Sequence, residues 1–121
     1  MITTVVKRVE IEAAHFLPNY VGKCSTLHGH RWIIEVGVFG EPDPVSGMVV
    51  DFKVLADFLD HRVVSKLDHH LINEEIKNPT AENICAWIWD IMVKFPFLDK
   101  DSGVSLVRVW ETGDSYAEIC L

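Results

Sequence analysis

Apolar and polar residues alternate along the first part of the 121-residue chain and again near its end. The alternation covers residues 2–14 and 31–39, and it returns in residues 104–111 and 115–121. A period of two places successive side chains on opposite faces of a β-strand, so each segment is predicted to be a strand with one buried face. A tight turn at residues 112–114 predicts that the last two strands form a hairpin.

The middle of the chain has a different period, because its apolar residues recur every three or four positions. Asp51 is a favourable N-cap for a first helix, and the apolar face that follows consists of Phe52, Leu55, Leu59, Val63 and Leu67. Thr80 is the expected N-cap of a second helix, whose apolar face consists of Ile84, Ile88, Ile91 and Phe95. A short strand is predicted at residues 48–50, and residues 68–79 are predicted to be irregular.

The predicted elements follow the order β-β-α-α-β-β, which is typical of an α+β fold. We expect a four-stranded antiparallel sheet with both helices packed on one face. The length fits one domain of ordinary size, spanning residues 1–121, and is too short for two. The edge strands of such a small sheet carry unpaired backbone groups, which association with further copies can pair. We therefore expect a homo-oligomer.

The composition of the chain narrows the class of function. Lysine plus arginine number 11 and aspartate plus glutamate number 18, giving 11 − 18 = −7. An acidic chain lacks the basic surface on which non-specific nucleic-acid binding depends. No apolar run approaches the roughly 20 residues of a membrane span. The three widely spaced cysteines argue against a disulfide framework. We therefore expect a cytoplasmic protein without nucleic-acid or membrane partners.

Two histidines, His28 and His30, flank a single glycine just before the second predicted strand. Residues two apart on a strand point to the same face, and antiparallel pairing of the first two strands would bring His15 beside them. Three imidazoles with a fourth position for water or substrate would form a catalytic zinc site. Cys24 is the alternative fourth ligand, and a closed site of one cysteine and three histidines would be structural. The spacing alone leaves both arrangements open, and an exposed His-x-His pair needs no metal at all.

A second polar group lies in the segment LDHHLIN. Asp68 directly precedes His69, and a carboxylate beside an imidazole orients the ring and raises its basicity for proton transfer. A solvated helix end, where histidine is favourable against the helix dipole, is the structural alternative. Glu111 ends a predicted strand, where its carboxylate could accept two hydrogen bonds from the N–H groups of a ligand or simply face water. Glu82, near the start of the second helix, is explained by the helix dipole.

Six motifs follow one another along nearly the whole chain: EAAHFLP at 12–18, C-x3-HGH at 24–30, GMVVDFKVL at 47–55, LDHHLIN at 67–73, NPTAEN at 78–83 and VWET at 109–112. Their order resembles that of the 6-pyruvoyl-tetrahydropterin synthase superfamily. The spacing of the cysteine from HGH is most similar to the 6-carboxy-5,6,7,8-tetrahydropterin synthase branch, which makes a queuosine precursor. The resemblance implies a tunnelling fold (T-fold). In it, subunits join their sheets into a trimeric barrel and two trimers stack into a hexamer, with active sites at subunit interfaces.

The resemblance also implies a metal site and a nucleophilic or basic thiol. His15, His28 and His30 match the zinc ligands of the family. Cys24 matches a catalytic cysteine that is not a ligand, so the resemblance favours the open metal site over the closed one. Lys23 and Arg31 flank this motif and are candidates for contact with a triphosphate.

Further matches concern the pterin and the proton transfers. Asp68 and His69 match a proton-relay pair, and Glu111 matches the acid that anchors the pterin ring. Thr80 and Glu82 match a part of the substrate pocket that the neighbouring subunit supplies.

The activity implied by the resemblance is that of a zinc-dependent lyase. The implied substrate is 7,8-dihydroneopterin triphosphate, and the implied products are 6-carboxy-5,6,7,8-tetrahydropterin, acetaldehyde and triphosphate. A 6-pyruvoyl-tetrahydropterin synthase, or another dihydroneopterin side-chain lyase on the same site, is the alternative enzyme. A non-catalytic zinc- or pterin-binding protein is the alternative without catalysis.

Overall fold

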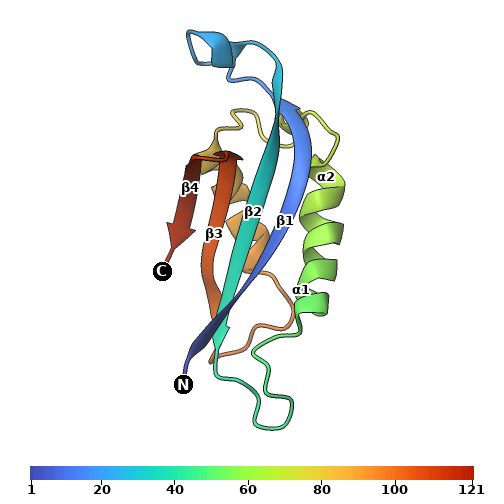
Figure 1. Ribbon diagram of the computed structural model, residues 1–121, viewed down its shortest axis with the longest axis vertical. Coiled ribbons are helices and arrows are strands. Elements are labelled where there is room, and N and C mark those ends of the chain that lie inside the picture. The colour runs from blue at the N-terminus through green and yellow to red at the C-terminus, as the bar shows by residue number, and fades with distance from the viewer.

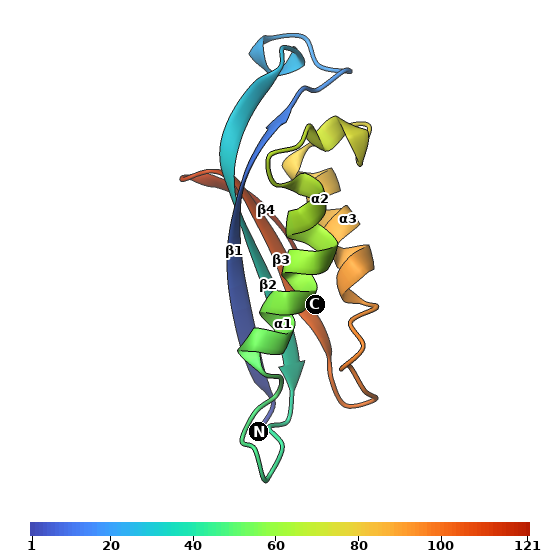
Figure 2. The same ribbon diagram turned by 90° about the vertical axis from the view of Figure 1, so that its right-hand side faces the viewer.

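The computed structural model describes residues 1–121 as a four-stranded sheet with helices on one of its faces (Figure 1, Figure 2). The elements are β1 (Thr3–His15), β2 (His28–Gly40), α1 (Phe52–Leu59), α2 (Ser65–Leu67), α3 (Ala81–Met92), β3 (Gly103–Thr112) and β4 (Ser115–Cys120). A π-helical turn over Asp60–Val64 joins α1 to α2, so these two form one helical run. The predicted α+β fold and the predicted order of elements are confirmed.

The sheet is antiparallel throughout, and its strand order β1-β2-β3-β4 is the order along the chain. The long β1–β2 ladder runs from Thr3 opposite Gly40 to His15 opposite His28. β2 begins three residues before the predicted segment, because the HGH motif pairs with the end of β1 and extends the ladder.

One face of the sheet and the facing sides of the helices form a single core. Alternate strand residues contribute the sheet side of it: Ile11, Ala13, Trp32, Ile34, Val36, Val38, Val104, Val107 and Val109. The helices contribute Leu55, Leu59, Val63, Leu67, Ile84, Ile88 and Met92. Phe52 does not join them, because it lies 52% exposed in the first turn of α1 and the buried stripe begins at Leu55. None of the helices combines the length and apolarity that a membrane span needs.

The strand predicted at residues 48–50 does not form. The chain closes a compact loop there, in which the N–H of Asp43 donates a hydrogen bond to the carbonyl of Met48 at 2.9 Å. Gly47 has a φ of 74°, a left-handed conformation that glycine adopts without steric cost. The two valines of this segment are half-buried against the core, so their apolar character reflects packing and not a ladder.

Both predicted helix N-caps are observed. The carboxylate of Asp51 accepts a hydrogen bond from the backbone N–H two residues on at 2.8 Å, and the hydroxyl of Thr80 accepts one from Asn83 at 3.1 Å. Pro79 directly precedes the cap of α3, so the start of this helix also determines where the Pro79 carbonyl lies.

The segment after α2 covers part of the free edge of β1. His69 N–H donates to the carbonyl of Glu12 at 2.7 Å, and Ala14 N–H donates to the carbonyl of His70 at 3.3 Å. The predicted irregular stretch contains one 3-10 turn, Ile72–Glu74, whose first residue is fully buried. These bonds hold residues 68–71 beside the end of β1 that carries His15.

Candidate metal centre and adjoining cavities

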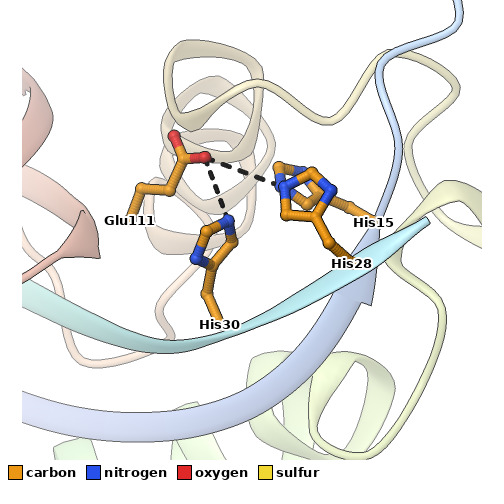
Figure 3. Close-up of side chains that lie close together, drawn as sticks. All are labelled: His15, His28, His30 and Glu111. Carbon is orange, nitrogen blue, oxygen red and sulfur yellow. Dashed lines mark hydrogen bonds and ion pairs between the residues drawn. The ribbon is translucent and has the colours of Figure 1, made fainter. Parts of the chain in front are cut away.

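Three histidines from β1 and β2 converge on one point, as Figure 3 shows. His15 lies directly opposite His28 in the ladder, and His30 follows on the same face of β2. The Nε2 atoms of His15 and His28 are 3.1 Å apart. Glu111, near the end of β3, completes a group whose ligand atoms all lie within 4.8 Å of one another. The strand register thus brings together the three histidines that the sequence suggests as ligands.

Backbone carbonyl groups determine which ring nitrogen carries the proton. Nδ1–H of His15 donates to the carbonyl of Pro79 at 2.8 Å, and Nδ1–H of His28 donates to the carbonyl of Thr26 at 2.7 Å. A carbonyl can only accept, so Nδ1 of each ring carries a proton, and in the neutral form of either ring its Nε2 atom presents a lone pair. Two lone pairs at 3.1 Å repel each other unless a cation lies between them.

The pKa values of His15 and His30 are also shifted in the direction that favours metal binding. Burial lowers the pKa of His15, whose side chain is 1% exposed, and burial also lowers the pKa of His30 against the opposing effect of Glu111. Burial therefore favours the neutral form of both rings. Nε2 of His30 is buried without a hydrogen-bond partner, although Oε1 of Glu111 lies 3.2 Å away. A bound cation would satisfy both atoms.

Three of the six separations within the group are close to those around a tetrahedral ion. Zinc holds nitrogen and oxygen ligands at about 2.0–2.1 Å, which places the ligand atoms roughly 3.4 Å from one another. The observed separations are 3.1 Å between His15 and His28, 3.2 Å between His30 and Glu111, and 3.6 Å between His15 and Glu111. Imidazole and carboxylate are donor types that zinc accepts. The residues present therefore fit a zinc ion.

Trp32 supports two of the histidines, a role that its place in the strand pattern did not reveal. The indole is fully buried, and its N–H donates to the carbonyl of Ala13 at 3.1 Å. The rings of His15 and His30 pack edge-on against it, with centroids 4.8 Å and 5.3 Å away. Because the indole is held by its own hydrogen bond, it limits the rotation of both imidazoles.

Asp68 and His69 form an oriented pair beside β1. Oδ1 of Asp68 accepts a hydrogen bond from Glu12 N–H at 2.9 Å and lies 3.1 Å from Nδ1 of His69. The bond from Glu12 holds the pKa of Asp68 below its usual value, so the carboxyl group stays ionised and can accept from the imidazole. His69 has a φ of 58°, which is uncommon for a residue other than glycine. The side chain is 75% exposed, so the imidazole is held by its backbone and presented to solvent.

Two cavities adjoin these groups. The first, of about 550 Å³, is lined by His30, His69 and Arg31 among others, so one histidine of the cluster and the imidazole of the Asp68–His69 pair border the same space. The second, of about 430 Å³, is lined by Glu82, Glu111 and residues of β4. Glu82 and Glu111 border this cavity within one chain.

Cys24 lies apart from these groups. It occupies a 3-10 turn, Lys23–Ser25, in the loop that joins β1 to β2 and extends past the end of the sheet (Figure 1). The residue is half-buried, and its backbone carbonyl accepts a hydrogen bond from Leu17 N–H at 2.8 Å. It belongs neither to the histidine group nor to the lining of either cavity. Cys24 is therefore not a member of the group of possible metal ligands in this structure, and the fourth member of that group is Glu111.

The sheet with helices on one face, and the three histidines at the end of its first hairpin, define a small α+β protein with a candidate metal centre. The model of the 6-pyruvoyl tetrahydropterin synthase family matches residues 4–120, and the chain therefore belongs to this family. Its T-fold is shared with the structure of Caenorhabditis elegans 6-pyruvoyl tetrahydropterin synthase, at a TM-score of 0.88 and 23% identity. That match covers 100% of this chain and 96% of that one.

Two relatives carry different names. A Synechocystis sp. protein named 6-carboxy-5,6,7,8-tetrahydropterin synthase is 41% identical over 91 residues, which are 70% of each chain. A Pyrococcus furiosus protein named dihydroneopterin monophosphate aldolase is 34% identical over 119 residues, which are 98% of each chain. The predicted family, fold and enzyme class are confirmed: the chain is an enzyme of the tetrahydropterin synthase type. The family does not by itself determine the reaction.

Proposed function

We propose that the protein is a zinc-dependent lyase of queuosine biosynthesis. It would convert 7,8-dihydroneopterin triphosphate and water into 6-carboxy-5,6,7,8-tetrahydropterin, acetaldehyde and triphosphate. The observation that carries the proposal is the cluster of three imidazoles next to a cavity that also contains His69. The C-x3-HGH spacing and the 41% identity to the Synechocystis synthase support this set of products.

The zinc ion would be held by the Nε2 atoms of His15, His28 and His30. When bound, it supplies Lewis acidity to the oxygens of the substrate side chain, which makes the neighbouring C–H and O–H groups easier to deprotonate. The hydrogen bonds to the carbonyls of Pro79 and Thr26 would keep two of the rings in the tautomer that can bind metal.

The proton transfers would be carried out by side chains of the protein. His69 would exchange protons with one face of the substrate side chain, and the ionised Asp68 would stabilise its imidazolium form. Cys24, as a thiolate, would exchange protons with the other face. Since Cys24 and His69 line no common cavity in one chain, we propose that they meet where two copies adjoin in a hexamer of two stacked trimers.

The pterin ring would be anchored by Glu111. Its two carboxylate oxygens would accept hydrogen bonds from the amino group and the ring N–H of the pterin, an arrangement with both strength and directionality. Glu82 lines the same cavity, and Thr80 caps the helix that carries it, so the start of α3 would form the rest of the pterin pocket.

A product assay tests the proposal. Purified zinc-loaded protein would be incubated with 7,8-dihydroneopterin triphosphate, with the Cys24→Ala protein as an inactive control. We expect acetaldehyde and 6-carboxy-tetrahydropterin together. Pyruvoyl-pterin would instead identify a 6-pyruvoyl-tetrahydropterin synthase.

A dihydroneopterin aldolase is the second candidate, because the Pyrococcus furiosus relative covers 98% of both chains. Offering the monophosphate and the triphosphate side by side separates the two candidates. Glycolaldehyde with hydroxymethyl-pterin, formed from the monophosphate, would favour the aldolase. No product from either compound, at full zinc occupancy, would favour a non-catalytic zinc- or pterin-binding protein.

A further inference from the structure

Glu111 occupies a position that the role of pterin anchor does not explain. Its Oε1 atom lies 3.2 Å from Nε2 of His30 and 3.6 Å from Nε2 of His15, as the dashed lines in Figure 3 mark. The same side chain, 30% exposed, lines the 430 Å³ cavity beside Glu82. Glu111 therefore stands between the histidine cluster and the cavity in which the pterin ring would bind.

Hydrogen bonding does not account for this position. Nε2 of His15 carries no proton, because its Nδ1–H is bonded to the carbonyl of Pro79. Nε2 of His30 is buried and has no hydrogen-bond partner. The carboxylate thus faces the Nε2 atoms of both rings without a hydrogen bond to either, an arrangement that a shared cation would make attractive.

We propose that Glu111 is a fourth metal ligand that closes the site in the ligand-free protein and leaves it when a pterin ring enters the cavity. This proposal rests on the proposed zinc site and pterin pocket. A tetrahedral ion with four protein ligands has no place for a substrate, whereas three ligands leave one open. The carboxylate of Glu111 would bind either the ion or the edge of the pterin ring. Binding of the ring would therefore remove Glu111 from the ion and free one coordination position.

The exchange would make the enzyme selective. Part of the energy of binding the pterin ring would be spent in releasing Glu111 from the ion, so only molecules with the correct ring edge would gain access to it. A small diol or phosphate without a pterin ring would find all four coordination positions of the ion occupied by protein ligands. Recognition of the pterin ring and release of a coordination position on the ion would then both depend on Glu111.

The experiment uses the full chain loaded with cobalt(II), whose visible absorption reports the number and type of ligands. The probe is pterin without a side chain, because it has no hydroxyl groups with which to reach the ion. We expect the cobalt spectrum of the wild type to change when this probe binds. We expect Glu111→Gln to lower the affinity for cobalt by about tenfold or more. Glu82→Gln is the matched control, since it removes a charge from the same cavity and should leave cobalt affinity unchanged.

Three results would contradict the proposal. A Glu111→Gln protein with the cobalt affinity and spectrum of the wild type would show that Glu111 is not a ligand. Probe binding, detected by equilibrium dialysis, without a spectral change in the wild type would show that the carboxylate is not displaced. A chain that takes up no metal would overturn both the zinc site and this inference.

Cobalt affinity, the cobalt spectrum and probe binding are all measured without catalytic turnover. If Glu111 leaves the ion on pterin binding and yet no product forms, only the proposed reaction is therefore disproved.

Discussion

Cys24 and the histidines should respond differently to substitution, because only the histidines belong to the metal group. We expect Cys24→Ala to keep one zinc per chain and to lose turnover by a factor of about 10²–10⁴, the usual contribution of a positioned acid or base. His28→Ala should lose both the metal and the activity. Metal analysis and the product assay measure the two properties.

Cys120→Ala is the control for this substitution, since Cys120 is exposed at the end of β4 and should tolerate the change in both measurements. A Cys24→Ala protein without zinc would mean that the thiol is a ligand after all.

Glu111 is expected to affect pterin affinity directly. Glu111→Ala should weaken binding of a pterin measured by titration, because the two hydrogen bonds to the ring edge would be lost. Unchanged affinity would remove the anchoring role.

Asp68 should make stability depend on pH in the acid range. The hydrogen bond from Glu12 lowers its pKa below the ordinary 3.8. The stabilisation is therefore complete above 3.8 and is lost as the pH falls through the lowered pKa. Across this interval the free energy of unfolding should fall more in the wild type than in Asp68→Asn. Denaturant unfolding in a series of acidic buffers measures both, and parallel curves would contradict the assignment.

At the scale of elements, the π-helical turn explains how α1 and α2 present one continuous apolar face. Leu55, Leu59, Val63 and Leu67 are four residues apart, and all are fully buried. An α-helix has 3.6 residues per turn, so a strict spacing of four would drift around its axis. The turn over residues 60–64 contains an i→i+5 bond, from Ser65 N–H to the carbonyl of Asp60. It winds the chain less per residue and returns the stripe to the sheet.

The buried face of α1 predicts which of its residues can be substituted with little loss of stability. Leu59→Ala should lower the free energy of unfolding by about 2–5 kcal/mol, because it leaves a cavity in the core. Phe52→Ala, in the same helix, should cost much less because that ring is half exposed. Chemical denaturation of the two variants measures the difference, and equal losses would contradict the assigned packing.

At the scale of the whole molecule, the strand at the free edge of the sheet and the distance of Cys24 from the cavities both point to association. β4 has a neighbour on one side only, and the loop that carries Cys24 exposes Tyr20, Val21 and Leu27. A hexamer would have six times the 13.7 kDa of the chain, about 82 kDa. Sedimentation equilibrium measures this mass, and a particle of 13.7 kDa would contradict the proposed assembly.

Sites shared between copies can also be tested by mixing. Cys24→Ala and His69→Ala should each be inactive, but oligomers formed from both should regain part of the activity, because some interfaces would combine an intact thiol with an intact imidazole. Activity that never returns, although mixed oligomers form, would place both groups in the same chain.

The sequence by itself determined the element order, the two helix caps and the convergence of His15, His28 and His30. These features are local, since they depend on periodicity within a segment or on two strands joined by one hairpin. The first two strands pair in a register that keeps their apolar residues on one face and puts His15 opposite His28.

Only the tertiary structure decided the surroundings of this cluster. Glu111 reaches His30 because β3 packs against β2, and Pro79 holds His15 because α3 starts beside the sheet. The left-handed backbone of His69 follows from the pairing of its segment with the edge of β1. Contacts between elements far apart in the chain leave no periodic signal, so the sequence could place these residues on elements but could not show which of them would touch.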